Sequence, residues 1–326
     1  MLEDALLQFV PGDVKQHVTK ARDRYNLAIR EALRAETGLR MGRFELADDD
    51  RGNHRSRDTV AVPITVRAGL PEVLATNPRC FEDAKLGRWR PTLENLRTAC
   101  AQAREMILEV DDVESNATTL AAIAPELDRV HHTVSEVLDE LDRSDPVRAL
   151  LAVNEDVLGV YRYSFSRATN FPTTSDTFDQ RIELYWLVIG LVAQLLNCSI
   201  EALTGVVLAH ELAHAYTQAG FDIDGENWQG TSFLESELEV KEGLAQYYTH
   251  RICDRFRDKF PELKPAFAQL EPKQPPAYQT HREWIEQFRP EDVRVALLRS
   301  RRSGCGVELR EFKNALGAAK TMLKRP

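Results

Sequence analysis

The spacing of apolar residues predicts that much of the first half of the chain is helical. Between Val14 and Ala35, the apolar residues Val18, Ala21 and Tyr25 recur every three or four positions and therefore share one helical face. The same pattern predicts further helices, over residues 91–108, 117–141 and 146–153. We expect a mainly helical N-terminal region that comprises residues 1–154.

Two segments of this region do not follow the helical pattern. The polar run Asp48–His54 is predicted to be an exposed loop. Residues Thr59–Val66 are rich in β-branched side chains and predict a strand. Pro63 cannot donate a backbone hydrogen bond, so this strand is expected at a sheet edge or at a bulge.

The pattern changes near residue 155, where aromatic and β-branched residues become frequent. Val157–Phe165 and Arg181–Trp186 are predicted to be strands, and the apolar run Leu187–Leu196 is predicted to begin a helix. The sequence therefore indicates a small sheet in the middle of the chain.

Two longer helices are predicted after this sheet. The Ser199 hydroxyl can accept a hydrogen bond from a free backbone N–H of the first turn, which favours a helix over Ile200–Gln218 that ends before Gly220. The second helix is predicted over Leu234–Phe256. Three prolines then indicate a linker or wrapping loop, and residues 280–324 predict two or three short helices. The fold class is expected to be α+β and predominantly helical.

Composition and charge narrow the classes of function. The formal net charge is −9 and the sequence pI is about 5.5, which argues against binding of nucleic acid or of an anionic membrane by the whole chain. The stretch Leu184–Leu196 is too short to span a bilayer, and the first residues lack the basic and apolar segments of a secretory leader. The five cysteines form no CxxC pair, which fits free thiols in a reducing compartment. We expect a cytoplasmic protein, and its oligomeric state is left open.

The sharpest chemical signal is the string His210-Glu211-Leu212-Ala213-His214. Helical positions i and i+4 lie one turn apart on the same face, so the two imidazoles can bind one metal ion. Glu211 is then close enough to act as a base toward water at the metal. The predicted helix over residues 200–218 supplies the conformation that this spacing requires.

Glu242 is the candidate for a third ligand. It follows His214 by 28 positions and lies on the next predicted helix, within Val240-Lys241-Glu242-Gly243-Leu244-Ala245-Gln246-Tyr247. Hydrolytic zinc commonly takes three protein ligands and leaves the fourth position for water. Small or apolar neighbours surround Glu242, which favours a carboxylate turned toward a site over one turned toward solvent.

Together, HELAH and the later EGLAQY string resemble the gluzincin metallopeptidases, the clan of thermolysin-like enzymes and aminopeptidases. The resemblance covers residues 157–256. It implies a zincin-like catalytic core over residues 155–260, with a small sheet and two metal-bearing helices, and with residues 261–326 packed on this core. It also implies one Zn²⁺ per chain, held by His210, His214 and Glu242, and Glu211 as the general base. The implied substrate is a peptide or protein that pairs with an edge strand, for which residues 159–165 and 181–186 are candidates.

The sequence also departs from the gluzincin pattern. Many members carry an acidic residue four positions after the third ligand, where this chain has Gln246. No GxMEN string is present, so a preference for free amino termini is unsupported. Gln246, Tyr247 and His250 are candidates for supporting a ligand or stabilising the transition state. Tyr216, Tyr248, Tyr278 and His281 are further candidates for the latter role.

Two alternatives remain open at this point. The first is a non-catalytic zincin-like module for binding or sensing, with a structural metal. Glu211 argues against it, because a structural site does not need a base beside its ligands. The second is a helical interaction protein with a chance HExxH string, which predicts that Glu242 lies far from His210. The role of the N-terminal region, to complete a cleft or to regulate access to it, is not decided by the sequence.

Overall fold

The structure, a computed structural model, describes ten segments of the chain. These are residues 10–41, 44–48, 54–58, 62–68, 89–109, 117–152, 157–166, 177–222, 233–303 and 306–323. The chain divides into two compact units. One unit contains residues 1–71 together with residues 155–326, and the other contains residues 72–154. The unit that carries the HExxH string thus includes the first 71 residues of the chain.

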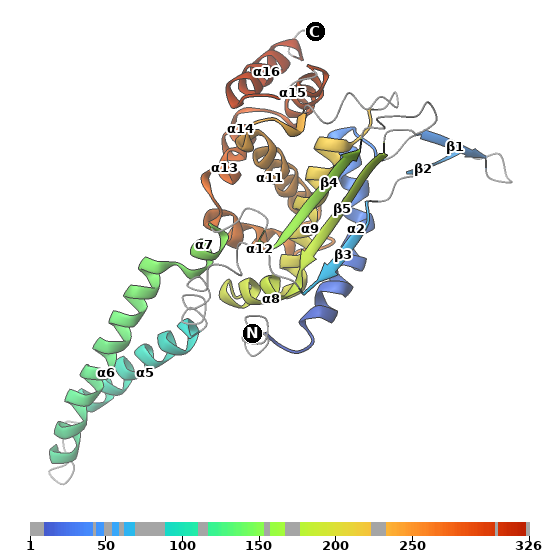
Figure 1. Cartoon of the computed structure of the whole chain (residues 1–326). Helices are drawn as coiled ribbons and strands as arrows, with labels where there is room; N and C mark the ends of the chain where they lie inside the picture. The colour runs from blue at the N-terminus through green and yellow to red at the C-terminus, as the bar shows by residue number, and fades with distance from the viewer. Residues whose placement is uncertain are drawn as a thin grey trace. The chain divides into compact units, whose positions relative to one another are not determined.

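The larger unit is mostly helical and contains a small sheet (Figure 1). Its strands are β1 (Phe44–Asp48), β2 (His54–Asp58), β3 (Ile64–Arg67), β4 (Gly159–Ser166) and β5 (Thr177–Tyr185). Its helices are α2 (Val14–Thr37), α8 (Trp186–Leu195), α9 (Ile200–Ala219), α11 (Leu238–Arg255), α12 (Leu263–Leu270), η1 (Glu271–Lys273), α13 (Pro276–Gln279), α14 (His281–Gln287), α15 (Pro290–Arg302) and α16 (Leu309–Met322). The predicted fold class, α+β and predominantly helical, is confirmed.

The main sheet has the strand order β3-β5-β4, with β3 parallel to β5 and β4 antiparallel to it. Pro63 precedes β3, and its carbonyl accepts a hydrogen bond from the Ile182 N–H at 2.8 Å. The expected edge position of this strand is confirmed within the described sheet. Residues 181–186 were a candidate for the substrate-binding edge, and this prediction is wrong because β5 lies between two strands. β4 has one neighbouring strand among those described, so it remains the candidate edge.

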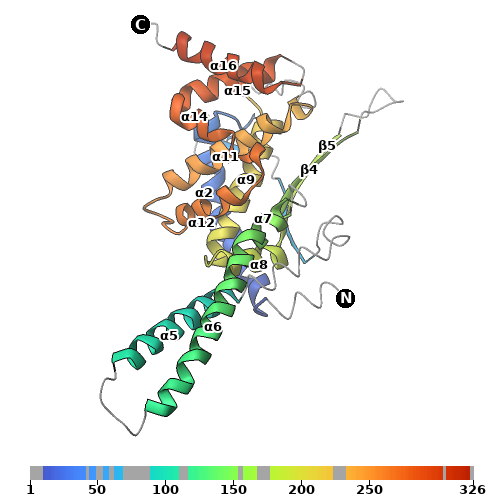
Figure 2. The same cartoon turned by 90° about the vertical axis from the view of Figure 1, so that its left-hand side faces the viewer.

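Helix α9 is the centre of the larger unit. Every residue from Ala202 to Ala219 is buried, although several of them are polar. Helices α2, α8, α11 and α12 and strands β4 and β5 all pack against it. A helix surrounded in this way is expected to be apolar around its whole circumference, so each buried polar side chain on it needs a specific partner. Figures 1 and 2 show α9 between the sheet and the other helices.

Most predicted helices agree with the structure to within a few residues, but one boundary is wrong. The helix predicted from Leu234 begins at Leu238. Just before it, the Val307 N–H donates to the Ser236 Oγ at 3.0 Å, and the Glu237 N–H donates to the Val307 carbonyl at 3.1 Å. Residues 236 and 237 therefore form hydrogen bonds with Val307, about 70 positions later in the chain, in place of the helical hydrogen bonds of the first predicted turn.

Other differences concern short elements. The strands β1 and β2 pair in antiparallel fashion, from Phe44 opposite Asp58 to Asp48 opposite His54, and they were not predicted. The interior of the predicted loop, residues 49–53, lies outside the described residues, as do residues 59–61 of the predicted strand. Helices α12 and α13 were also not predicted.

The described residues of the smaller unit form helices α5 (Arg90–Glu109), α6 (Ala117–Ser144) and α7 (Pro146–Leu151), all three of which were predicted. Helices α5 and α6 lie side by side in Figures 1 and 2. Val134, Leu138 and Leu141 of α6 form a small core against which Leu93 of α5 packs. Their three- and four-residue spacing is that of an apolar seam between two helices. None of the described helices in either unit combines the length and apolarity needed to cross a bilayer.

Gly243 gives a direct test of the packing next to the third candidate ligand. A Cβ atom at Gly243 would lie 2.6 Å from Cη2 of Trp284, which is fully buried between α11 and α16. We therefore expect Gly243→Ala to lower the free energy of unfolding by about 1–3 kcal/mol, measured by urea denaturation. At Gly317 of α16, nothing lies within 4 Å of the added atom. The control Gly317→Ala should instead stabilise by about 0.5–1 kcal/mol, and equal effects of the two changes would contradict the close packing.

Candidate metal centre

Three side chains from two helices converge on one point. His210 and His214 lie one turn apart on α9, and their Nε2 atoms are 3.0 Å from each other. Oε2 of Glu242, on α11, lies 3.2 Å from Nε2 of His210 and 3.3 Å from Nε2 of His214. All three residues are buried, with 6–8% of their surface exposed. The structure thus brings together the three predicted ligands, and it contradicts the expectation that a chance HExxH string would leave Glu242 far from His210.

The triangle formed by these three atoms fits a small cation. Ligands at about 2.0–2.1 Å from a tetrahedral metal lie about 3.3 Å from one another. The three measured separations are close to this value. In addition, Oε2 of Glu242 is buried and has no hydrogen-bond partner among the described residues. Such an atom has a high free-energy cost unless a partner satisfies it. The residues are therefore suited to holding a metal ion.

The protonation states of His210 and Glu242 also suit metal binding. Burial lowers the pKa of His210, which favours the neutral imidazole with a free nitrogen lone pair. Burial by itself would raise the pKa of Glu242, but the two neighbouring imidazoles outweigh this and hold the pKa well below its usual range. A neutral imidazole and an ionised carboxylate are the forms in which these groups bind metals.

Gln218 supports His214 and was not predicted from the sequence. Its side-chain amide lies 3.0 Å from Nδ1 of His214, and both residues are buried on α9. An amide can present either its oxygen or its NH₂ group at this position. Metal binding through Nε2 of His214 requires the oxygen, which then accepts the Nδ1 proton. The i+4 spacing from His214 to Gln218 is the sequence signal that could have identified it.

Gln218→Leu is expected to weaken metal binding about 10- to 100-fold, because His214 would lose the acceptor that fixes its tautomer. Competition with a zinc chelator of known affinity measures this change. Gln218→Glu serves as the matched control, because a carboxylate still accepts the Nδ1 proton and should keep or increase the affinity. Equal affinity of the leucine variant and the unchanged protein would show that Gln218 does not orient His214.

Glu211 lies on α9 at a close approach of this helix to β4. It is buried, with 5% of its surface exposed. A Cβ atom at Gly159, the first residue of β4, would lie 2.9 Å from Cγ1 of Val207 and 3.3 Å from Cγ of Glu211. A glycine is therefore needed for the strand to lie this close to the helix. The position of Glu211 places the predicted base beside the beginning of the candidate edge strand.

Gln246 has a different partner from the one expected. Its amide NH₂ donates to Oε1 of Gln274 at 2.7 Å, which connects α11 to the segment before α13. Its own Oε1 is buried and has no hydrogen-bond partner among the described residues, and the same is true of Nδ1 of His210. The predicted support of a ligating histidine by Gln246 is therefore not formed as a hydrogen bond in this structure, and it stays a prediction.

Tyr278 covers one face of His210. The two rings are nearly parallel, with an interplanar angle of 16° and centroids 5.5 Å apart. Nδ1 of His281 lies 2.8 Å from the Tyr278 carbonyl, to which it can donate a hydrogen bond. Burial lowers the pKa of His281 to about 4, so this imidazole is neutral near pH 7. Among the aromatic and histidine candidates, Tyr278 is thus placed in contact with a ligand by the structure.

Tyr247 and His250 contact other parts of the larger unit. Tyr247 packs edge-on against Tyr248, and burial raises its pKa, with Arg251 and Glu36 among the nearby charges. His250 lies about two helical turns beyond Glu242 on α11. Its Nδ1 is 3.5 Å from Oδ2 of Asp254. Neither of these contacts involves the three ligands, and the proposed roles of Tyr247 and His250 at the site stay predictions.

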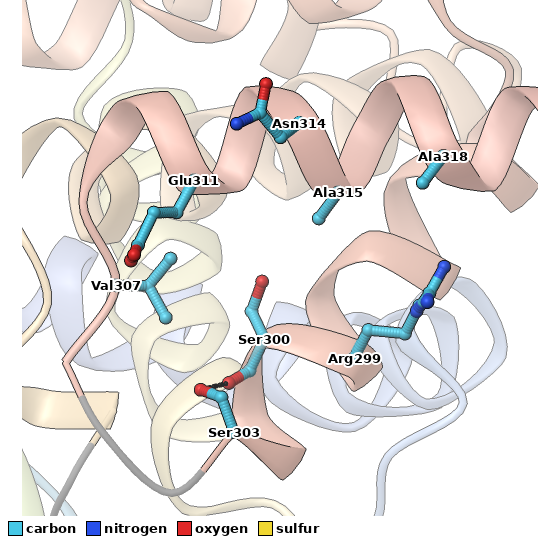
Figure 3. A pocket seen from close by; sticks show the side chains of 8 residues that line it. All are labelled: Arg299, Ser300, Ser303, Val307, Glu311, Asn314, Ala315 and Ala318. Carbon is cyan, nitrogen blue, oxygen red and sulfur yellow. Dashed lines mark hydrogen bonds between the residues drawn. The ribbon is translucent and has the colours of Figure 1, made fainter.

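A hollow of about 400 Å³ lies elsewhere, between α15 and α16 (Figure 3). Arg299 and Glu311 stand at opposite ends of it, and the Ser303 hydroxyl donates to the Ser300 carbonyl at 2.6 Å. The remaining lining residues are Ser300, Val307, Asn314, Ala315 and Ala318, together with Ser303. None of the three candidate ligands lines this hollow, so it is separate from the candidate metal centre.

Comparisons with known proteins assign neither a family nor a function to this chain. No family model matches the chain, and no curated protein and no solved structure matches it either. Function must therefore be inferred from the geometry and chemistry of the site.

Proposed function

We propose that this chain is a zinc-dependent metallopeptidase of the zincin type. His210, His214 and Glu242 are its metal ligands, and Glu211 is its general base. The observation that carries this proposal is the convergence of two imidazole nitrogens and one carboxylate oxygen within 3.0–3.3 Å of one another on α9 and α11. The position of Glu211, directly after the first of these histidines and beside β4, supports a hydrolytic role over a purely structural one.

The donor set favours zinc over other divalent ions. Two nitrogens and one oxygen are the ligands of many hydrolytic zinc sites, whereas magnesium and calcium prefer oxygen ligands alone. Three protein ligands leave one position of a tetrahedral ion for water or substrate. The close packing of α9 against α2 and α11 holds the ligands in place before the ion binds.

Zinc bound at this centre would make water more acidic and would polarise the carbonyl group of a peptide. Glu211 accepts the proton of the attacking water and then delivers it to the amine that leaves. The backbone of β4 offers hydrogen bonds to an extended peptide, which adds to the sheet as a further strand. The Tyr278 ring restricts the movement of His210 by stacking on it.

The test combines metal content with hydrolysis. The purified full-length protein is expected to contain about one zinc ion per chain by mass spectrometry, and to cleave a mixed peptide library. Removal of the zinc by a chelator should stop cleavage, and its return should restore cleavage. Absence of zinc after metal-replete preparation would overturn the proposal at its first step.

A non-catalytic binding or sensing module is the alternative that the same experiment addresses. It predicts stoichiometric zinc without cleavage of any library member. In that case, peptides from the library that bind without being cut would identify the site as a recognition module.

A further inference from the structure

The α5–α6 pair of the smaller unit has a charged side and an apolar side. On the charged side, Arg90 of α5 forms an ion pair with Asp142 of α6. A second ion pair joins Arg104 to Asp128. The residue numbers add up to 232 in both pairs, so the helices run in opposite directions and residues with this sum lie level with each other. These ion pairs close one side of the seam between the two helices.

The opposite side of α6 is apolar. Asp142, on the charged side, follows the buried core residue Leu138 by four positions. Val130, by contrast, precedes the core residue Val134 by four positions. Residues four positions before and four positions after inward-facing residues lie on opposite flanks of a helical seam. Val130 and Asp142 are therefore on different sides of the helix pair.

Helix α5 has the same arrangement. Arg104 follows the buried Cys100 by four positions, whereas Leu96 precedes it by four. Met106 comes two positions after Arg104, which places it about 200° farther around the helix. Leu96 and Met106 therefore lie on the apolar side of the pair, away from the ion pairs.

Five side chains form an apolar stripe on this side. They are Leu96 and Met106 of α5 and Ile123, Val130 and Val137 of α6, and each has 36–61% of its surface exposed. The three on α6 recur every seven positions and therefore lie along one line. Single exposed apolar residues are ordinary, whereas a contiguous row of them marks a surface that another element covers. A third apolar position in every seven, beside a two-helix seam, is also typical of helices in a larger bundle.

The stripe is nearly symmetric about Val130. Ile123 and Val137 each lie about 10.5 Å from it along α6. Leu96 lies level with position 136 of α6 and Met106 with position 126, so these two flank Val130 at about 9 and 6 Å. A two-fold axis through Val130, at right angles to the helices, would place each half of the stripe against the other half of a second stripe. A surface that is complementary to itself in this way favours a second copy of the chain as its occupant.

The charges beside the stripe are compatible with such a pairing. Glu126 and Glu140 each form an ion pair with the arginine three positions later on α6. With the axis through Val130, facing positions of the two α6 helices are equally far from this residue. Glu126 therefore faces the region of Thr133 of the second copy, and not another carboxylate. The rim of the stripe thus presents no like-charge contact at this level.

The size of the surface is also sufficient for a specific dimer. Helix α5, the shorter of the two, has 20 residues, which corresponds to about 30 Å. Two packed helices are about 18–20 Å wide, because their axes lie about 8–10 Å apart. Each copy would contribute a face of roughly 550 Å², and two copies would bury roughly 1,100 Å², which reaches the area of about 1,000 Å² that specific interfaces need.

We propose that two copies of this chain associate through their apolar stripes, so that two α5–α6 pairs form a four-helix bundle. The two α6 helices lie antiparallel to each other, and Val130 lies on the two-fold axis. This association goes beyond the proposed peptidase function and does not depend on it. Each dimer contains two candidate metal centres.

Sedimentation equilibrium of the full-length protein, from about 1 to 100 μM, measures its mass and its dimer dissociation constant. The unchanged protein is expected to reach twice the mass of one chain, which is 37.0 kDa. Val130→Glu places two carboxylates against each other at the axis and should raise the dissociation constant at least about 100-fold. His132, exposed and about 200° around α6 from Val130, provides the matched control. His132→Glu should leave the dissociation constant unchanged.

Single cysteines test the position of the axis. Under mild oxidation, Val130→Cys should link two chains through position 130, above the level of the unchanged protein. Val137→Cys should link chains mainly when it is mixed with Ile123→Cys, because the axis brings these two positions together. His132→Cys should stay at the level of the unchanged protein.

Three results would overturn the proposal. The first is an unchanged protein that keeps the mass of one chain at the highest concentration, even if another protein binds its stripe. The second is a dimer that Val130→Glu does not weaken, because the association then uses another surface. If circular dichroism shows that Val130→Glu loses helix, the cysteine variants decide. The third result is a Val137→Cys variant that links with itself as well as Val130→Cys does. None of these measurements depends on cleavage, so the peptidase function can fail while the dimer stands, and the reverse.

Discussion

Glu211→Gln is expected to lower kcat about 10²- to 10⁴-fold while the zinc content stays at that of the unchanged protein. Glutamine has nearly the same shape as glutamate, so the side chain should keep its place beside Gly159. It cannot accept a proton from water near pH 7, and a positioned general base contributes about this factor to hydrolysis. Zinc content and cleavage of the best library peptide are measured on the same preparation.

Glu201→Gln provides the control for this change. Glu201 lies in the first turn of the same helix, where it is partly exposed and contacts His17. Its replacement removes one carboxylate from α9 without touching the ligands. If Glu211→Gln retained more than about a tenth of the activity, another group would have to act as the base and the assigned mechanism would be incorrect.

Glu242→Gln is expected to remove the stabilisation that zinc gives to the folded protein. A ligand at 100 times its Kd stabilises the native state by about 2.7 kcal/mol. For a unit of roughly this size, that corresponds to a rise in Tm of about 5–10 °C. The neutral amide is a much weaker metal ligand than the carboxylate, so the zinc-dependent rise should largely disappear. Differential scanning calorimetry with and without zinc measures the change.

Glu239→Gln is the matched control for this second change, because it lies in the first turn of α11, one helical turn before Glu242. It should show the full rise in Tm with zinc. A Glu242→Gln protein that keeps the full rise would exclude Glu242 as a ligand, whatever the activity of the variant. Measurement of Tm also separates loss of metal from loss of catalysis, which activity alone does not do.

The candidate metal centre could be predicted from the sequence as far as the positions of its residues depend on local geometry. The spacing of His210 and His214 fixes their relation through the geometry of a single helix, without any knowledge of the remaining fold. Glu242 required the further assumption that two successive helices pack together, and the 3.2–3.3 Å separations support that assumption. Gln218 also followed a local rule, but a glutamine on a helix has many ordinary roles, so its spacing alone carried little information.

Features that depend on contacts between distant segments could not be predicted. Nothing in the residues near Tyr278 indicates that its ring lies on His210, 68 positions earlier. The central position of β5 depends on its pairing with β3, which is far away in the sequence. The strand β2, His54–Asp58, contains no apolar residue, so its sequence pattern gave no sign of a strand. The beginning of α11 was also set by a distant partner, Val307.

The parallel pairing of β3 and β5 has a consequence for the order in which the protein forms. Ile64 pairs with Ile182, so 118 positions separate the two partners, and the whole smaller unit lies between them. A ribosome must release both strands before the sheet can close, and closing so long a loop is slow. The α5–α6 pair, by contrast, needs only neighbouring residues and can fold as soon as it emerges. A nascent chain would thus carry a folded hairpin well before Glu242 reaches the two histidines, and any proteolytic activity would begin only after most of the chain has been made.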